Sequence, residues 1–170
     1  SGEKDGQWFE WHDNGQIRLK ETYKANKRNG KWLLWFYNGQ IEIEGDYIND
    51  KKSGKWITWY PWGWRSYEIN GGKNESSFIL WFDDQQRSSE GFYRNDVRDQ
   101  TWVWWSREGI LDSSGVFNRG IRSGKWTFRD PEANKQLEGR YQDGMLSGLI
   151  TVAIDEAFNE EYEQFDIMDK

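Results

Sequence analysis

Residues 30–47 read GKWLLWFYNGQIEIEGDY, and this stretch contains the pattern that decides the fold. Residues 32–37 form a β-prone aromatic run, and Asn38-Gly39 directly after it is a strong signal for a two-residue hairpin turn. Residues 41–44 then alternate apolar and polar side chains, as expected for a strand with one exposed face. The stretch therefore predicts a β-hairpin, and Asn49-Asp50 predicts a second tight turn that leads into the next copy.

The same pattern recurs along the whole chain. The tripeptide Gly-Lys-Trp returns at 54–56 and at 124–126, and equivalent positions follow one another at intervals of 24 residues, except for one interval of 22. Self-similarity at a fixed period of this length indicates a stacked array of one supersecondary unit. The position that begins each copy, here called the anchor, is occupied by Trp8, Trp32, Trp56, Phe78, Trp102, Trp126 and Ile150.

A second periodic position follows most anchors by fifteen residues. It is occupied by Tyr23, Tyr47, Ile69, Tyr93, Phe117, Tyr141 and Phe165. A glycine two residues earlier, at 45, 91, 115 and 139, leaves room for a neighbouring ring to lie on the backbone. Both intervals, 24 and 22, are even, so every copy keeps the same face of the strand.

These patterns predict an all-β fold. We expect an elongated, single-layer antiparallel meander of about seven 24-residue β-hairpin repeats. The array occupies 3–166, and 167–170 form a tail. No helical periodicity is present, so no α-helix longer than about two turns is expected between residues 5 and 155.

Composition agrees with a thin sheet. Only 35% of the residues are hydrophobic, and aromatic residues (18%, including 13 tryptophans) supply about half of these, so large rings such as Trp32 and Trp56 are expected to be structural. The net charge of −6 argues against nucleic acid and against electrostatic binding to anionic membranes. The chain has no cysteine, which removes disulfides and cysteine-based zinc sites. The sequence shows no signal peptide or transmembrane run, and it leaves a cytoplasmic and an extracytoplasmic location equally open.

The repeat unit resembles a known family. It consists of Gly-Lys-Trp, then Asn-Gly, then Glu-Gly-x-Tyr at 44–47, 90–93 and 138–141, and then Asn-Asp or Asp-Gly. This resembles the MORN repeat, and more closely its bacterial Trp-rich variant, whose arrays are sometimes described as antitoxin-like. The resemblance implies an array of β-hairpins that contacts other proteins. It implies no shared catalytic residues, and we expect no enzymatic activity, cofactor or metal.

Two sets of tryptophans are candidates for binding. Trp62 and Trp64 lie at a predicted turn, where exposed rings often mark a contact site. Either they form a binding knob, or the shortened third copy folds them back onto the sheet. A second ladder, three residues after the anchors, lies on the opposite strand face and either lines a groove or forms a contact surface. We name it the Trp ladder: Trp11, Trp35, Trp59, Trp81 and Trp105.

The favoured interpretation is a non-enzymatic scaffold that presents an aromatic face on a rigid β-rod to another protein. One alternative is a carbohydrate-binding module that stacks sugars on exposed tryptophans. Another is an antitoxin-like inhibitor of one cognate partner protein. A glycoside hydrolase needs two carboxylates that face each other across a cleft, and a single repeating sheet offers no such cleft.

Overall fold

The protein folds as one antiparallel β-sheet. The computed structural model describes residues 2–72, 74–130, 132 and 135–152, and this part of the chain contains fourteen strands and no helix. The strands are β1 (Gly6–Trp11), β2 (Ile17–Lys24), β3 (Lys27–Arg28), β4 (Gly30–Trp35), β5 (Ile41–Ile48), β6 (Lys51–Trp59), β7 (Arg65–Gly71), β8 (Glu75–Trp81), β9 (Arg87–Arg94), β10 (Val97–Trp105), β11 (Leu111–Asn118), β12 (Ile121–Asp130), β13 (Lys135–Gln142) and β14 (Met145–Val152).

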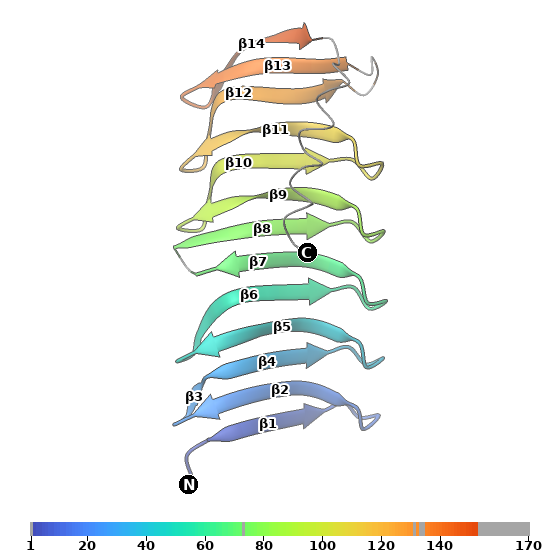
Figure 1. Cartoon of the computed structure of the whole chain (residues 1–170), viewed down its shortest axis with the longest axis vertical. Helices are drawn as coiled ribbons and strands as arrows, with labels where there is room; N and C mark the ends of the chain where they lie inside the picture. Colours follow the sequence, from blue (N-terminus) through green and yellow to red (C-terminus); the bar gives the residue numbers. More distant parts are fainter. Residues whose placement is uncertain (1, 73, 131, 133–134, 153–170) are drawn as a thin grey trace, which may run out of the picture.

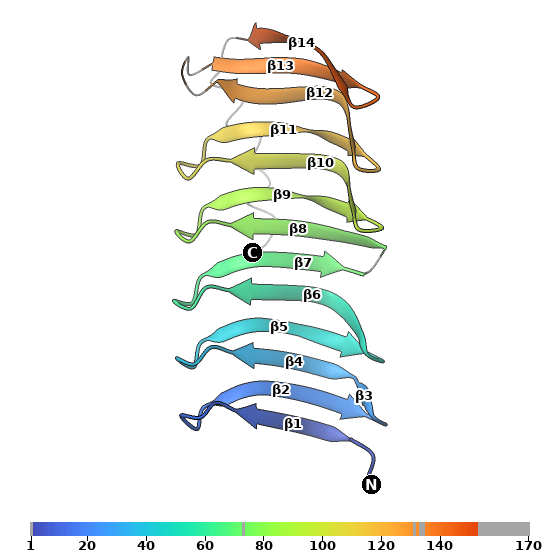
Figure 2. The same ribbon diagram turned by 180° about the vertical axis from the view of Figure 1, so that it is seen from behind.

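Consecutive strands are neighbours throughout the sheet. The strand order follows the sequence from β1 to β14, and only the short β3 lies off this path, paired with β2. Figures 1 and 2 show a single layer in which the strands stack along the long axis of the molecule. The predicted all-β, single-layer meander of hairpins is therefore confirmed.

One long edge of the sheet, here called the hairpin edge, contains the loops within each copy. The Phe36 N–H donates to the Gln40 carbonyl (2.9 Å), the Gly39 N–H donates to the Phe36 carbonyl (3.0 Å), and Gly39 has φ +82°. This is a three-residue loop with a left-handed glycine, so the predicted two-residue turn was one residue too short. The Asn38 side chain explains the difference, because its Oδ1 accepts from the Gln40 N–H (3.0 Å) and its Nδ2 donates to Pro61 in the next loop (2.7 Å).

The opposite edge, here called the turn edge, contains two-residue turns between copies. Asn49 and Asp50 have φ of 49° and 63°, as a turn with two left-handed residues requires. The Asp50 N–H donates to the Arg28 carbonyl (3.0 Å), and the Arg28 N–H donates to Asp50 Oδ1 (2.9 Å). The turns at 25–26, 95–96 and 119–120 make an equivalent backbone bond to the residues before the preceding anchor, which helps to hold these copies in register.

The anchor rings pack flat on the glycines of the preceding strand. A Cβ on Gly115 would lie 2.1 Å from the Trp126 ring, and Gly91 and Gly45 stand in the same relation to Trp102 and Trp56. Trp102 and Trp126 are only 1% and 0% exposed, although the sheet has a single layer. The predicted role of the glycines at 45, 91 and 115 is confirmed; the fourth, Gly139, precedes residue 150, whose side chain is outside the described residues.

The third copy departs from the predicted alignment. Ile69 pairs with both Trp56 and Phe78, which is the register that the glycines have in other copies. The assignment of Ile69 to the tyrosine series was therefore wrong, because the two missing residues come from the turn after β7. Phe78 is smaller than tryptophan, and we attribute this to the side chain of Ile69 occupying the space that glycine leaves elsewhere.

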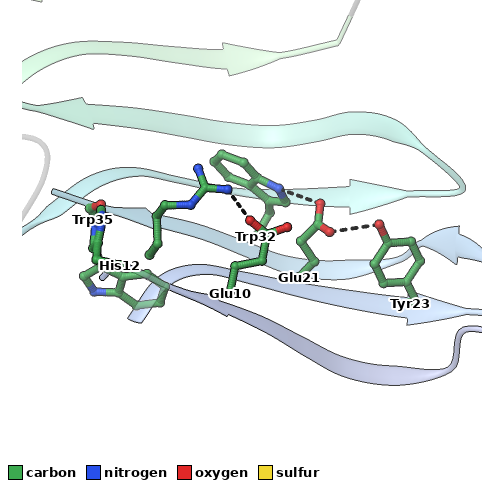
Figure 3. A network of polar contacts seen from close by, with 7 residues as sticks. Glu10, His12, Glu21, Tyr23, Trp32 and Trp35 are labelled. Atoms are coloured by element: carbon green, nitrogen blue, oxygen red, sulfur yellow. Dashed lines mark hydrogen bonds and ion pairs between the residues drawn. The ribbon is translucent and has the colours of Figure 1, made fainter. Parts of the chain in front are cut away.

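The first copy also lacks the glycine. Glu21 stands opposite Trp32, and its carboxylate accepts hydrogen bonds from Trp32 Nε1 (3.1 Å) and from the Tyr23 hydroxyl (2.9 Å), as Figure 3 shows. Trp32 is consequently half-buried, whereas Trp56 is buried. Burial, and after it the hydrogen bond to Glu21, raises the pKa of Tyr23 above its usual range.

We expect Glu21→Gln to lower the pKa of Tyr23 toward its ordinary value. The Glu21 carboxylate accepts a hydrogen bond from the Tyr23 hydroxyl, and its negative charge opposes ionisation of the phenol. Replacement by a neutral amide therefore favours the tyrosinate. A pH titration of the Tyr23 ring signals by NMR measures the shift. An unchanged Tyr23 titration would show that the bond to Glu21 does not form in solution.

Part of the seventh copy lies outside the described residues. Strand β14 contains the backbone of Ile150, but the side chain of this anchor is not described. Phe165, the end of the predicted array at residue 166 and the predicted tail 167–170 likewise lie outside the described residues.

Candidate functional site

The loop between β6 and β7 carries the two candidate tryptophans Trp62 and Trp64. The Tyr60 N–H donates to the Trp64 carbonyl (2.7 Å), and the Gly63 N–H donates to the Tyr60 carbonyl (2.9 Å). This loop has the same backbone bonds as the hairpin loops at 12–16, 36–40, 82–86 and 106–110, so its backbone shape follows the repeat. Trp62 is 54% exposed and Trp64 is 39% exposed. Both rings are therefore partly accessible to solvent, although one face of the Trp62 ring is covered by Tyr60.

Tyr60 supports the more exposed of these rings. The Tyr60 and Trp62 rings stack with an interplanar angle of 3° and a centroid separation of 5.0 Å. The Tyr60 hydroxyl donates to the Trp81 carbonyl (3.3 Å), which fixes Tyr60 to strand β8. The sequence analysis missed Tyr60 as part of the site. Its signal was present, because the equivalent position four residues after the anchor is also aromatic in Phe36 and Phe82.

The Trp ladder lies on the face of the sheet opposite to the anchors, which we call the ladder face. Its members end their strands next to the hairpin loops, each at a register shift of the same kind. Trp11 is 59% exposed, and the other four members are half-buried. The structure thus brings the ladder and the Trp62 loop to the same long edge of the rod.

Some charged side chains along this edge contact a ring or an opposite charge. The Arg65 guanidinium lies over the Trp81 ring, 5.8 Å from the centre of the ring. Arg107 donates to Asp83, and this hydrogen bond holds the pKa of the Asp83 carboxyl below its usual range. Both groups are exposed, so the pair contributes little to stability. At this point of the edge the charges are thus held by each other, next to the aromatic residues.

A further periodic feature escaped the sequence analysis. Four residues before most anchors stands a basic residue whose cation lies over an aromatic ring of the anchor face, the face that carries the anchors. The signal in the sequence was the 24-residue recurrence of lysine or arginine, which becomes visible only when the copies are aligned on their anchors. We name this set the cation row: Lys4, Arg28, Lys52, Arg98 and Arg122.

Other kinds of site find little support in the described part of the chain. His12, the chain's one histidine, contacts the Trp35 carbonyl through Nε2 (3.0 Å), which is a structural bond between neighbouring copies. Within residues 2–72, 74–130, 132 and 135–152, no three histidine or carboxylate side chains converge as a metal site would require. None of these residues belongs to a helix long and apolar enough to cross a membrane.

Comparison with known families supports the repeat assignment. The model of the MORN repeat variant matches residues 4–25 and 28–49, which correspond to the first two copies. No curated protein sequence matches the chain significantly. The later copies keep the same strand pairing, with Trp102 opposite Gly115 as Trp32 is opposite Gly45. The array is a repeat scaffold, and its first two copies belong to the MORN-repeat family.

Proposed function

We propose that this protein is a non-enzymatic scaffold that binds another protein through its hairpin edge. The binding surface consists of Trp62 and Trp64 together with the neighbouring Trp ladder members Trp35, Trp59, Trp81 and Trp105. The observation that carries the proposal is the exposure of Trp62 and Trp64 on a loop whose backbone is fixed by hydrogen bonds.

The energetics of protein interfaces favour this surface. Interface hot spots are enriched in tryptophan and tyrosine, and loss of one such anchor costs about 2 kcal/mol or more of binding. Tyr60 holds the Trp62 ring by stacking, so little side-chain freedom is lost when a partner covers it. An antitoxin-like inhibitor would use the same surface on a single cognate partner.

The double variant Trp62→Ser/Trp64→Ser is expected to lose partner binding and to keep its melting temperature. Both rings are exposed, so their removal takes little buried area from the fold. Binding can be measured by quantitative mass spectrometry of proteins captured by the full-length chain, and stability by thermal denaturation.

Tyr37→Ser provides a matched control for this experiment. Tyr37 is an exposed aromatic residue on the neighbouring hairpin loop, outside the proposed surface. We expect it to retain the partners that the double variant loses. Equal capture by all three proteins would place the contact surface elsewhere, and a collapsed melting temperature of the double variant would make the two tryptophans part of the core.

A carbohydrate-binding module is the second candidate, because the exposed Trp62 ring lies parallel to Tyr60 and offers a flat apolar surface of the kind that sugar rings stack on. Titration of tryptophan fluorescence with soluble glycans separates the two functions. Saturable quenching that disappears in Trp62→Ser would favour the carbohydrate, and an unchanged spectrum is expected if the partner is a protein.

A further inference from the structure

The cation row differs from the other basic residues in what its side chains contact. Lys52 Nζ lies 4.1 Å from the centre of the Trp56 ring, and the Arg98 guanidinium lies 4.7 Å from that of Trp102. Among the described residues, Lys4, Lys52 and Arg98 have no carboxylate within 4.0 Å. Their cations lie over aromatic rings, and no carboxylate of the described residues forms an ion pair with them.

Several basic residues on the ladder face are instead paired with carboxylates. Lys55 Nζ lies 2.8 Å from a carboxylate oxygen of Glu68, and Arg87 Nη1 lies 2.8 Å from one of Glu90. Lys31 and Asp46 form an equivalent pair (2.9 Å). Several cations of the ladder face are therefore ion-paired, whereas Lys4, Lys52 and Arg98 on the anchor face have no carboxylate within 4.0 Å among the described residues.

The net charge of the chain does not contradict an anionic partner. Residues 153–170 contain seven carboxylates and one lysine, which account for the whole net charge of −6. Residues 1–152 contain 22 basic and 22 acidic side chains and are neutral overall. Residues 1–152 thus carry no net charge, and the cation row places positive charges on part of the anchor face.

We propose that the cation row is a second docking surface, which binds an acidic segment of a partner protein. The segment runs along the rod as a polyproline II helix with a carboxylate at every third residue. The motive is charge complementarity combined with spacing. Cations of adjacent copies are two strands apart, about 9.6 Å at ~4.8 Å per strand. One turn of a polyproline II helix has three residues and rises about 9.3 Å, and it returns each third side chain to the same side.

The row also predicts where the partner makes no ion pair. In the fourth copy Asn74 occupies the position of the cation, so Lys52 and Arg98 are four strands apart. This gap of about 19 Å equals two turns of the same helix, so the register of the partner continues across it. Arg28 and Arg122 contribute less to binding of the acidic segment. Arg28 already pairs with Asp50, and Arg122 donates to the Tyr141 hydroxyl.

The test uses two fluorescently labelled peptides of equal length and charge and the full-length protein. One peptide has glutamate at every third residue, and the other has the same glutamates in one cluster. Fluorescence anisotropy at low salt should show the spaced peptide binding at least about fivefold more tightly, and binding should weaken as salt screens the charges. Equal affinities would overturn the spacing argument, and no binding of either peptide would overturn the proposal.

Charge variants locate the bound peptide. Lys52→Glu/Arg98→Glu should weaken binding of the spaced peptide about tenfold, because each exposed ion pair contributes up to about fivefold. Arg140→Glu changes an exposed arginine on the ladder face and should alter the affinity by less than about twofold. If both variants weaken binding equally, the peptide is attracted by overall charge and the cation row is not its site. Lys52→Gln/Arg98→Gln tests the same site where the reversed charges disturb folding.

Two further measurements complete the design. A variant with the seven carboxylates of residues 153–170 changed to amides prevents this acidic segment from competing, and it should bind the spaced peptide at least as tightly as the parent chain. Vesicles containing phosphatidylserine test the other macromolecular source of negative charge. In one outcome the vesicles bind the parent chain but not Lys52→Glu/Arg98→Glu, while neither the parent chain nor the amide variant binds the spaced peptide. That result would replace the proposed protein partner by a membrane.

Discussion

Trp126→Ala is expected to lower the free energy of unfolding by about 3–5 kcal/mol, the range for truncation of a buried large aromatic residue. Trp126 is 0% exposed and contacts the Phe117, Tyr141 and Phe128 rings, so the variant removes the centre of the main core cluster. Its Nε1 also donates to the Val116 carbonyl (3.2 Å), which loses its partner. Chemical denaturation followed by circular dichroism measures the loss.

Trp11→Ala is the control for this variant. Trp11 belongs to the Trp ladder and is 59% exposed, so we expect its truncation to cost less than about 1 kcal/mol. A loss below about 1 kcal/mol for Trp126→Ala would mean that the ring is not buried and that the assignment of the two faces is inverted. The buried Trp56 should behave like Trp126, and the half-buried Trp32 should cost less than either.

Gly115→Ala is expected to destabilise the protein by about 3 kcal/mol, although it adds only one methyl group. The new Cβ would lie 2.1 Å from atoms of the Trp126 ring, and that ring cannot move away without leaving its contacts with Phe117 and Phe128. Overpacking of a filled core costs about 1–3 kcal/mol, and this clash lies at the upper end of that range. Thermal and chemical denaturation measure the effect.

Gly72→Ala is the matched control for this substitution. A Cβ added at Gly72 would meet no heavy atom within 4 Å, and the φ of this residue lies outside the left-handed region. We expect the stability of this variant to change by less than about 0.5 kcal/mol. If Gly115→Ala is as stable as Gly72→Ala, the anchor rings do not rest on the glycines.

The architecture could be predicted from the sequence because the same strand and turn pattern recurs in successive copies. The aromatic anchors, the glycines at 45, 91 and 115 and the even intervals together predicted the hairpin repeats, the pairing of consecutive strands and the packing of anchor rings on glycines. The errors occurred where a single side chain overrides the pattern. The Asn38 side chain lengthens its loop by one residue, and Ile69 takes the glycine register because the deletion lies in the following turn.

The candidate site was less predictable than the fold. Exposure of Trp62 and Trp64 could not be derived from the pattern, because a shortened copy is equally compatible with rings that fold onto the sheet. The support of Trp62 by Tyr60 depends on the hairpin bonds that bring the two rings together. The cation row was readable from the period, but its significance depends on which cations lie near a carboxylate, and strand register decides that.

The packing of anchor rings on glycine backbones is the central claim about this fold, and NMR tests it directly. A proton above the face of an indole ring resonates far upfield of its usual position. The account predicts strongly upfield-shifted Hα signals for Gly45, Gly91 and Gly115, with nuclear Overhauser contacts to Trp56, Trp102 and Trp126 respectively. Ordinary Hα shifts for all three glycines, without these contacts, would contradict it.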